Sequence, residues 1–153
     1  MKRSIVTLLI VAFCISLSAQ NIDDYMEVQR DVLKTEKKAV VAEVMSFTEE
    51  ESAVFWPLYN EYNEKMYVLN TETYHIIKDY AANFESLTDE KAVSLMNSRM
   101  KIEKELSSLE KTYFKKFQKI ITGKKAARYF QLENKIKAMI GAELALEIPL
   151  MEE

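Results

Sequence analysis

The stretch FTEEESAVFWPLYNEY, residues 47–62, opens the segment that decides the fold of this chain. From Phe55 onwards, large side chains recur at alternating spacings of four and three residues, which is the period of the buried seam of a coiled-coil helix. Only Thr73 is not a sizeable apolar residue. The seam positions are Phe55, Tyr59, Tyr62, Met66, Leu69, Thr73, Ile76 and Tyr80. The segment therefore predicts a long amphipathic helix.

Capping residues indicate where this helix begins. Thr48 is a favourable N-cap, and Glu51 three residues later completes a capping box, in which each side chain accepts a hydrogen bond from the other residue's backbone amide. Pro57 lies past the first turn and is expected to bend the helix without ending it. A helix over 49–83 is about 50 Å long at a rise of 1.5 Å per residue. It needs a partner of similar length.

The partner is predicted directly after a short turn at 84–87. Thr88 can cap a helix over 89–121, whose own stripe of apolar residues contains one polar member, Arg99. If the two helices fold back as an antiparallel hairpin, the numbers of facing residues add up to about 172. Phe55 then faces Phe117, and Thr73 shares a layer with Arg99. The other predicted layers are Tyr80 with Ala92, Ile76 with Leu95, Leu69 with Ile102, Met66 with Leu106, Tyr62 with Leu109 and Tyr59 with Tyr113.

Two further helices are predicted to flank this hairpin. Apolar residues recur over 24–45, and Thr122 can cap a helix over 123–146 that stops ahead of Pro149. The apolar tail at 148–151 is expected to dock. The chain has two glycines, two prolines and no run that alternates with period two. We therefore predict an all-α fold of four helices in one domain, 20–153, built around the long antiparallel hairpin.

Residues 1–19 have the pattern of a secretory signal peptide, with a basic start, an apolar run too short to span a membrane and a small-residue end. Cleavage after Ser18 and cleavage after Ala19 both stay open. Cleavage removes Cys14, the single cysteine, and thereby excludes disulfides and thiol chemistry in the mature chain. It also lowers the net charge of −3 by two units. We expect a mildly acidic, soluble, exported protein.

A second row of side chains on the helix over 49–83 lies about 100° round from the seam. Its members are Trp56, Asn63, Tyr67, Asn70, Tyr74 and Ala81. One interpretation is burial under a flanking helix. The other is an exposed groove in which Trp56, Tyr67 and Tyr74 bind apolar segments of other proteins. Flexible methionines would widen the range of partners. The methionines in question are Met66, Met96 and Met100.

The segment 111–128 carries seven basic residues and no acid. Export argues against a nucleic-acid partner, and part of the charge is expected to face the acidic start of the helix over 49–83, with Lys111 opposite Glu61. The rest is a candidate surface for acidic proteins or for peripheral contact with an anionic membrane, although solvated helix faces carry the same pattern. The candidate binding residues are Lys115, Lys116, Lys119, Lys124, Lys125 and Arg128.

His75 is the single histidine, and with Glu72 it forms the Glu-x-x-His spacing of di-iron four-helix proteins. Such a centre needs a second copy, so an exposed histidine is the favoured interpretation, and weak binding of zinc, nickel or copper stays an alternative. The sequence contains no recognisable nucleophile motif and no glycine-rich phosphate loop. We therefore expect no enzyme activity, no catalytic residue, no metal site and no cofactor.

Two segments resemble the repeated Leu-Thr-x-x-Gln signature of small exported helical proteins of the Spy and CpxP type. They are FTEEE at 47–51 and ITGKK at 121–125, in which Glu51 and Lys125 replace the glutamines. The runs FWPLYNEY at 55–62 and RYFQLE at 128–133 also resemble a Bacteroidetes-type branch of such proteins.

The resemblance implies a periplasmic, homodimeric helical protein that binds unfolded or stressed envelope proteins without ATP, or that signals envelope stress. It places the client-binding surface on basic and apolar residues, here the stretch from Lys115 to Arg128 and its neighbouring aromatics. Two alternatives stay open. The protein is a dedicated adaptor for a membrane sensor or an anti-sigma system, or it is a metal-responsive binding protein.

Overall fold

The computed structural model describes residues 34–151. The chain divides into two units, Met1–Val44 and Met45–Glu153. In the described part of the chain before Met45, residues 34–44 are helical, in agreement with the end of the predicted first helix. The predicted signal peptide and the start of that first helix lie outside the described residues.

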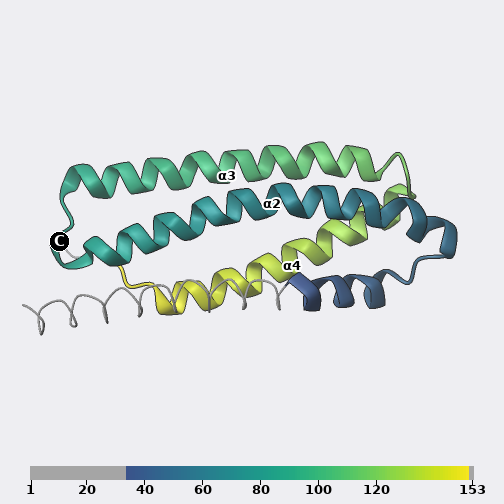
Figure 1. The fold of residues 1–153 in the computed structure, drawn as a ribbon, viewed down its shortest axis with the longest axis horizontal. Coiled ribbons are helices and arrows are strands. Elements are labelled where there is room, and N and C mark those ends of the chain that lie inside the picture. Colours follow the sequence, from purple (N-terminus) through teal and green to yellow (C-terminus); the bar gives the residue numbers. More distant parts are fainter. Residues whose placement is uncertain (1–33, 152–153) are drawn as a thin grey trace, which may run out of the picture. The chain divides into compact units, whose positions relative to one another are not determined.

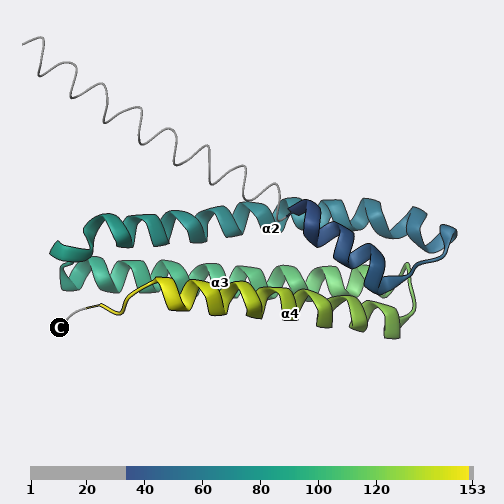
Figure 2. The same ribbon diagram turned by 90° about the horizontal axis from the view of Figure 1, so that it is seen from below.

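The second unit is built from helices in the order α2 (Glu49–Asn83), the short 3₁₀ helix η1 (Phe84–Ser86), α3 (Asp89–Phe117) and α4 (Gly123–Glu147). Figures 1 and 2 show α2 and α3 running antiparallel as a hairpin, with α4 beside them. The predicted all-α hairpin architecture is therefore confirmed. The third helix ends at Phe117 instead of 121, because the amides of Lys119 and Ile120 donate to carbonyls only three residues back and tighten the chain into a turn.

Three threonines begin the three long helices, as predicted. The hydroxyls of Thr48, Thr88 and Thr122 each accept a hydrogen bond of 3.3 Å from the backbone amide three residues further on. At the first of these caps, the Glu51 carboxylate also accepts from the Thr48 amide at 3.0 Å, which completes the capping box. α2 continues through Pro57 as one helix.

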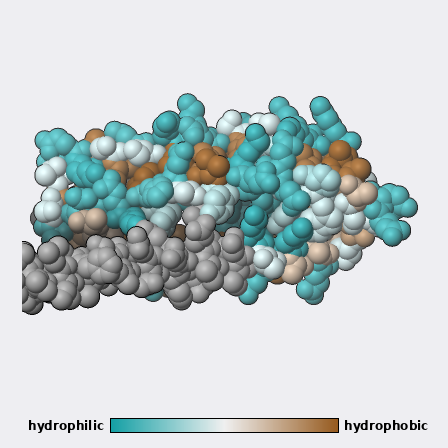
Figure 3. Space-filling model, viewed as in Figure 1, coloured by the Kyte–Doolittle hydropathy of each residue, from teal (hydrophilic) through white to brown (hydrophobic). Residues whose placement is uncertain are grey.

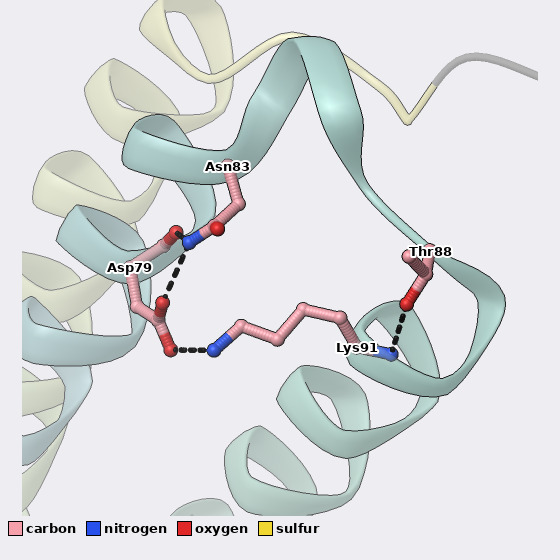
Figure 4. Close-up of polar contacts among 4 residues, drawn as sticks. All are labelled: Asp79, Asn83, Thr88 and Lys91. Atoms are coloured by element: carbon pink, nitrogen blue, oxygen red, sulfur yellow. Dashed lines mark hydrogen bonds and ion pairs between the residues drawn. The ribbon is translucent and has the colours of Figure 1, made fainter.

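Polar contacts close the hairpin at its turn (Figure 4). The Lys91 ammonium of α3 lies 2.6 Å from the Asp79 carboxylate of α2. That carboxylate also accepts a hydrogen bond from the Asn83 side chain at 2.9 Å. Because the Lys91 amide is held by the Thr88 cap, one residue fixes both the start of α3 and its position on α2. The ion pair is two-fifths exposed, so it contributes more to geometry than to stability.

The register of the hairpin agrees with the prediction at its open end. The rings of Phe55 and Phe117 have centroids 5.1 Å apart, as expected for facing residues. The ring of Tyr113, predicted to face Tyr59, lies 5.1 Å from that of Tyr62. Aromatic side chains of a helix lean towards its N-terminus. Tyr62 therefore leans away from the hairpin turn and Tyr113 leans towards it, so the two rings meet.

An aromatic core joins the three helices. α4 contributes Tyr129, whose ring centroid lies 5.1 Å from that of Phe55 and 5.0 Å from that of Phe117. These rings are completely buried, and such tilted and edge-to-face pairs are stabilising beyond their burial. The seam of α2 is less buried nearer the turn, where Leu69, Thr73 and Ile76 are only partly covered. The core is therefore concentrated at the end where α2 and α4 begin.

The two halves of α4 differ in packing. Its buried residues, Ala126, Tyr129 and Glu133, all belong to its first half. In its second half Met139 is 69% exposed and Leu146 is 86% exposed. The tail then returns to the hairpin, where the Tyr80 hydroxyl donates to the Pro149 carbonyl at 3.0 Å. The tail at 148–151 thus docks through its backbone, while the Leu150 side chain stays exposed.

Candidate functional site

The two segments that resemble the Leu-Thr-x-x-Gln signature lie side by side. Thr48 and Thr122 cap α2 and α4, and the Lys125 ammonium forms an ion pair with the Glu51 carboxylate. The same ammonium lies 5.7 Å from the ring centroid of Phe47. Glu51 and Lys125 are the residues that stand where the signature has glutamines. Opposite charges at these two positions therefore tie the starts of two helices together.

This ion pair also affects the acid at the start of α2. The hydrogen bond from Lys125, and after it the hydrogen bond from the Thr48 amide, lower the pKa of the Glu51 carboxyl. The carboxylate is therefore the favoured form at this junction. Glu51 serves the cap and the ion pair at once, which assigns it a structural role.

A second ion pair uses another of the predicted binding lysines. The Glu61 carboxylate accepts hydrogen bonds from the Tyr113 hydroxyl at 2.5 Å and from the Lys116 ammonium at 2.9 Å. Both bonds lower the pKa of the Glu61 carboxyl, the tyrosine contributing most. The prediction that Glu61 pairs with Lys111 was wrong, because its partner is Lys116. Lys111 lies five residues from Lys116, about 140° round the helix, and so points away from α2.

The basic segment is thus divided in two. Lys116 and Lys125 form ion pairs with acids of α2. Lys115, Lys119 and Lys124 are exposed, and no ion pair joins them to another residue of the described part of the chain. Arg128 is also exposed. The charge available to a partner is therefore smaller than the sequence suggests.

The second aromatic row on α2 is neither fully buried nor fully exposed. Trp56 is half-buried and meets the rings of Phe55 and Tyr59 edge-on, each at 5.1 Å. Tyr67 is 39% exposed. Tyr74 is half-buried and its ring lies 5.7 Å from that of His75. Trp56 therefore extends the core, and Tyr67 is the most accessible of the three predicted aromatic contacts.

Exposed apolar side chains are found on α3 and α4. Met96 and Met100, two of the predicted flexible methionines, are 45% and 56% exposed. Met66 is 5% exposed and belongs to the core, so its predicted part in partner binding was wrong. Its position in the seam explains why. Other exposed apolar residues on these helices are Val93, Met139, Leu144 and Leu146.

The core contains one acid that sequence reasoning missed. Glu133 of α4 is 2% exposed. Burial first, and the charge of Glu133 second, raise the pKa of the phenols of Tyr59, Tyr62 and Tyr129. A signal was available, because Glu133 continues the spacing that begins at Ala126 and Tyr129. The cluster therefore surrounds a carboxyl with neutral phenols.

A shallow groove of about 510 Å³ lies between α2 and α3. Its apolar floor is formed by Val68, Leu69 and Leu109, and Lys65 and Glu105 stand on opposite helices at its sides. Figure 3 shows hydrophobic surface in the band where these helices meet, broken up by hydrophilic side chains. The groove was not predictable from the apolar period, because its polar side residues, Lys65 and Glu105, do not follow that period.

His75 is exposed, as the favoured interpretation had it. Over residues 34–151, no three histidine, cysteine or acidic side chains gather in a group able to hold a metal ion. In the same range, none of the helices is both long enough and apolar enough to cross a membrane.

Comparison with known proteins gives no match: no family model, no curated protein and no solved structure is similar to this chain.

Proposed function

We propose that the protein is an exported, periplasmic, ATP-independent chaperone-like or envelope-stress protein that binds unfolded segments of other proteins. The observation that carries the proposal is the exposure of large apolar side chains on helices whose first turns are well capped and whose core is closed. On α4, Met139 and Leu146 are more than two-thirds exposed. On α3, Met96 and Met100 are about half exposed.

Three physical properties suit these surfaces to varied clients. Methionine side chains are flexible and polarisable, so they adapt to different apolar groups. The exposed lysines Lys115, Lys119 and Lys124 attract acidic segments and increase the rate of encounter. The same lysines support peripheral contact with an anionic membrane. Exchange of clients without ATP is consistent with shallow, solvent-exposed contacts.

The test is the suppression of aggregation by the chain 20–153, measured by light scattering of a denatured client at near-equal molar ratios. We expect the wild-type protein to suppress aggregation, and Met139→Ser with Leu146→Ser to weaken the effect. The matched control is Ala138→Ser with Ala145→Ser, which changes exposed neighbours on the same helix. Absence of suppression by the folded wild-type protein would contradict the proposal, as would equal loss in the control.

A dedicated adaptor for one membrane sensor or anti-sigma protein is the second candidate. It is favoured by the ion pairs of Lys116 and Lys125, which leave less free positive charge for unselective binding. Affinity capture from envelope extracts separates the two. One stoichiometric partner supports the adaptor, and many substoichiometric clients support the chaperone. We propose a homodimer in either case, and sedimentation velocity of the chain 20–153 tests it.

A further inference from the structure

The groove between α2 and α3 interrupts a ladder of interhelical ion pairs. Glu61 pairs with Lys116 at 2.9 Å on one side of it, and Asp79 pairs with Lys91 at 2.6 Å on the other. The first ion pair lies at one end of the groove, where Lys116 belongs to the lining, and the second lies near the hairpin turn, ten residues beyond Leu69 on α2. Between them the floor is apolar, and Val68 is 57% exposed on it.

The register places a further pair of opposite charges across this gap. Fourteen residues are about four helical turns. Moving that far from Asp79 and Lys91 brings Lys65 opposite Glu105, and both line the groove. They do not form the ion pair that the ladder would require. Glu105 instead pairs with Lys101 of its own helix at 3.8 Å. The charge of Lys65 helps to lower the pKa of the Glu61 carboxyl one turn away on α2, but no ion pair joins Lys65 to any residue in the range 34–151, so its ammonium can still pair with a ligand.

We propose that this groove binds a peptide segment in which a large apolar side chain lies next to an acidic residue. The apolar side chain packs on Val68, Leu69 and Leu109, and the carboxylate pairs with Lys65. An acidic partner fits better than a basic one, because the carboxylates near the groove, Glu61 and Glu105, already have cationic partners. The inference rests on the proposed function, since it names the class of segment that the protein selects.

The volume of about 510 Å³ suits one or two side chains of a partner. An exposed ion pair is worth about 1 kcal/mol or less, which is about fivefold in affinity at 25 °C. Added salt should weaken that contribution. We therefore expect moderate selectivity for acidic segments on top of apolar binding.

The test uses two fluorescein-labelled peptides of equal length and apolar content, one with acidic and one with basic flanking residues. Fluorescence anisotropy with the chain 20–153 should show about fivefold tighter binding of the acidic peptide, and Lys65→Glu should abolish that preference. Val68→Glu should weaken the binding of both peptides. The matched controls are Lys104→Glu and Val54→Glu, at exposed positions outside the groove. Val54 is 44% exposed, against 57% for Val68, so both valines should tolerate the change.

Equal affinity for the two peptides, or equal effects of the groove and control variants, would overturn the inference. Competition with laurate separates a peptide site from a lipid site, since binding of laurate without binding of either peptide also overturns it. Aggregation suppression is measured on the same samples. If the protein does not suppress aggregation but its peptide binding still depends on Lys65, the proposed function is contradicted and the inference about the groove is supported. If suppression is intact and the groove variants bind peptide as the wild type does, the groove inference alone fails.

Discussion

Replacement of Phe55 by alanine is the sharpest test of the packing that joins the three helices. The side chain is completely buried, and its ring lies 4.3 to 5.8 Å from those of five other aromatic residues. Removing a buried phenylalanine side chain costs about 3–5 kcal/mol, because burial is lost and a cavity is left. That is a large part of the roughly 5–15 kcal/mol that stabilises a typical domain.

Urea unfolding followed by circular dichroism measures this loss. With a slope of about 2 kcal/mol per molar urea, we expect the midpoint to fall by roughly 2 M. The matched control is Val54→Ala, one position earlier on α2, where the side chain is 44% exposed. That change should alter the free energy of unfolding by no more than about 0.5 kcal/mol.

A double-mutant cycle then tests the partner. Phe55→Leu and Phe117→Leu keep the site apolar, and their coupling energy should be about 0.5–1.5 kcal/mol if the rings meet as described. A cost of less than about 1 kcal/mol for Phe55→Ala, or additive effects of the two leucine variants, would contradict this packing. Either result would mean that α2 and α3 do not meet in this register.

Three further predictions concern polar groups. The Tyr62 hydroxyl is buried and has no hydrogen-bond partner among the described residues. Tyr62→Phe should therefore leave the free energy of unfolding unchanged or raise it. Tyr80→Phe should lower the free energy of unfolding by about 0.5–1.5 kcal/mol, because the hydrogen bond to the Pro149 carbonyl is lost. Thr122→Ala should cost about 1 kcal/mol by removing the cap of α4, measured against Thr112→Ser, which keeps a hydroxyl at an exposed mid-helix site. Since the pKa of the Glu61 carboxyl is lowered from 4.5 in the folded state, its contribution is present above that pH and is lost as pH falls through the folded-state value. Glu61→Gln should therefore flatten the acid side of the stability profile, and an unchanged profile would contradict this.

Local chemistry explains why the starts of the three long helices were predictable. A helix cap needs one threonine and a backbone amide three residues further on. The caps at Thr48, Thr88 and Thr122 can therefore be recognised from the sequence alone. The approximate hairpin register follows from the periods of the two stripes, and Phe55 meets Phe117 as expected. These features depend on short spacings and on the helical period alone.

The ring contacts, ion pairs and groove that were not predicted depend on the directions in which side chains point. Tyr113 meets Tyr62 because both side chains incline along their helices, which a rule based on residue numbers ignores. Glu61 pairs with Lys116 because Lys116 lies on the side of α3 that faces α2. Lys65 and Glu105 line the groove without forming an ion pair with each other, and no sequence pattern records which of several possible ion pairs forms.

The uneven packing of α4 has a consequence for motion. Amides over 127–133, past the first turn of α4, lie beside the buried core, so their hydrogen exchange should require global unfolding. Beyond Glu133 the helix has no buried side chain, and the tail is held by the hydrogen bond between Tyr80 and Pro149. This half should exchange its amides through local fraying at a much lower free-energy cost, and a protease should cut it before the packed parts of α2, α3 and α4. The second half of α4, which carries the exposed Met139 and Leu146, can then unfold and refold repeatedly while the aromatic core stays folded.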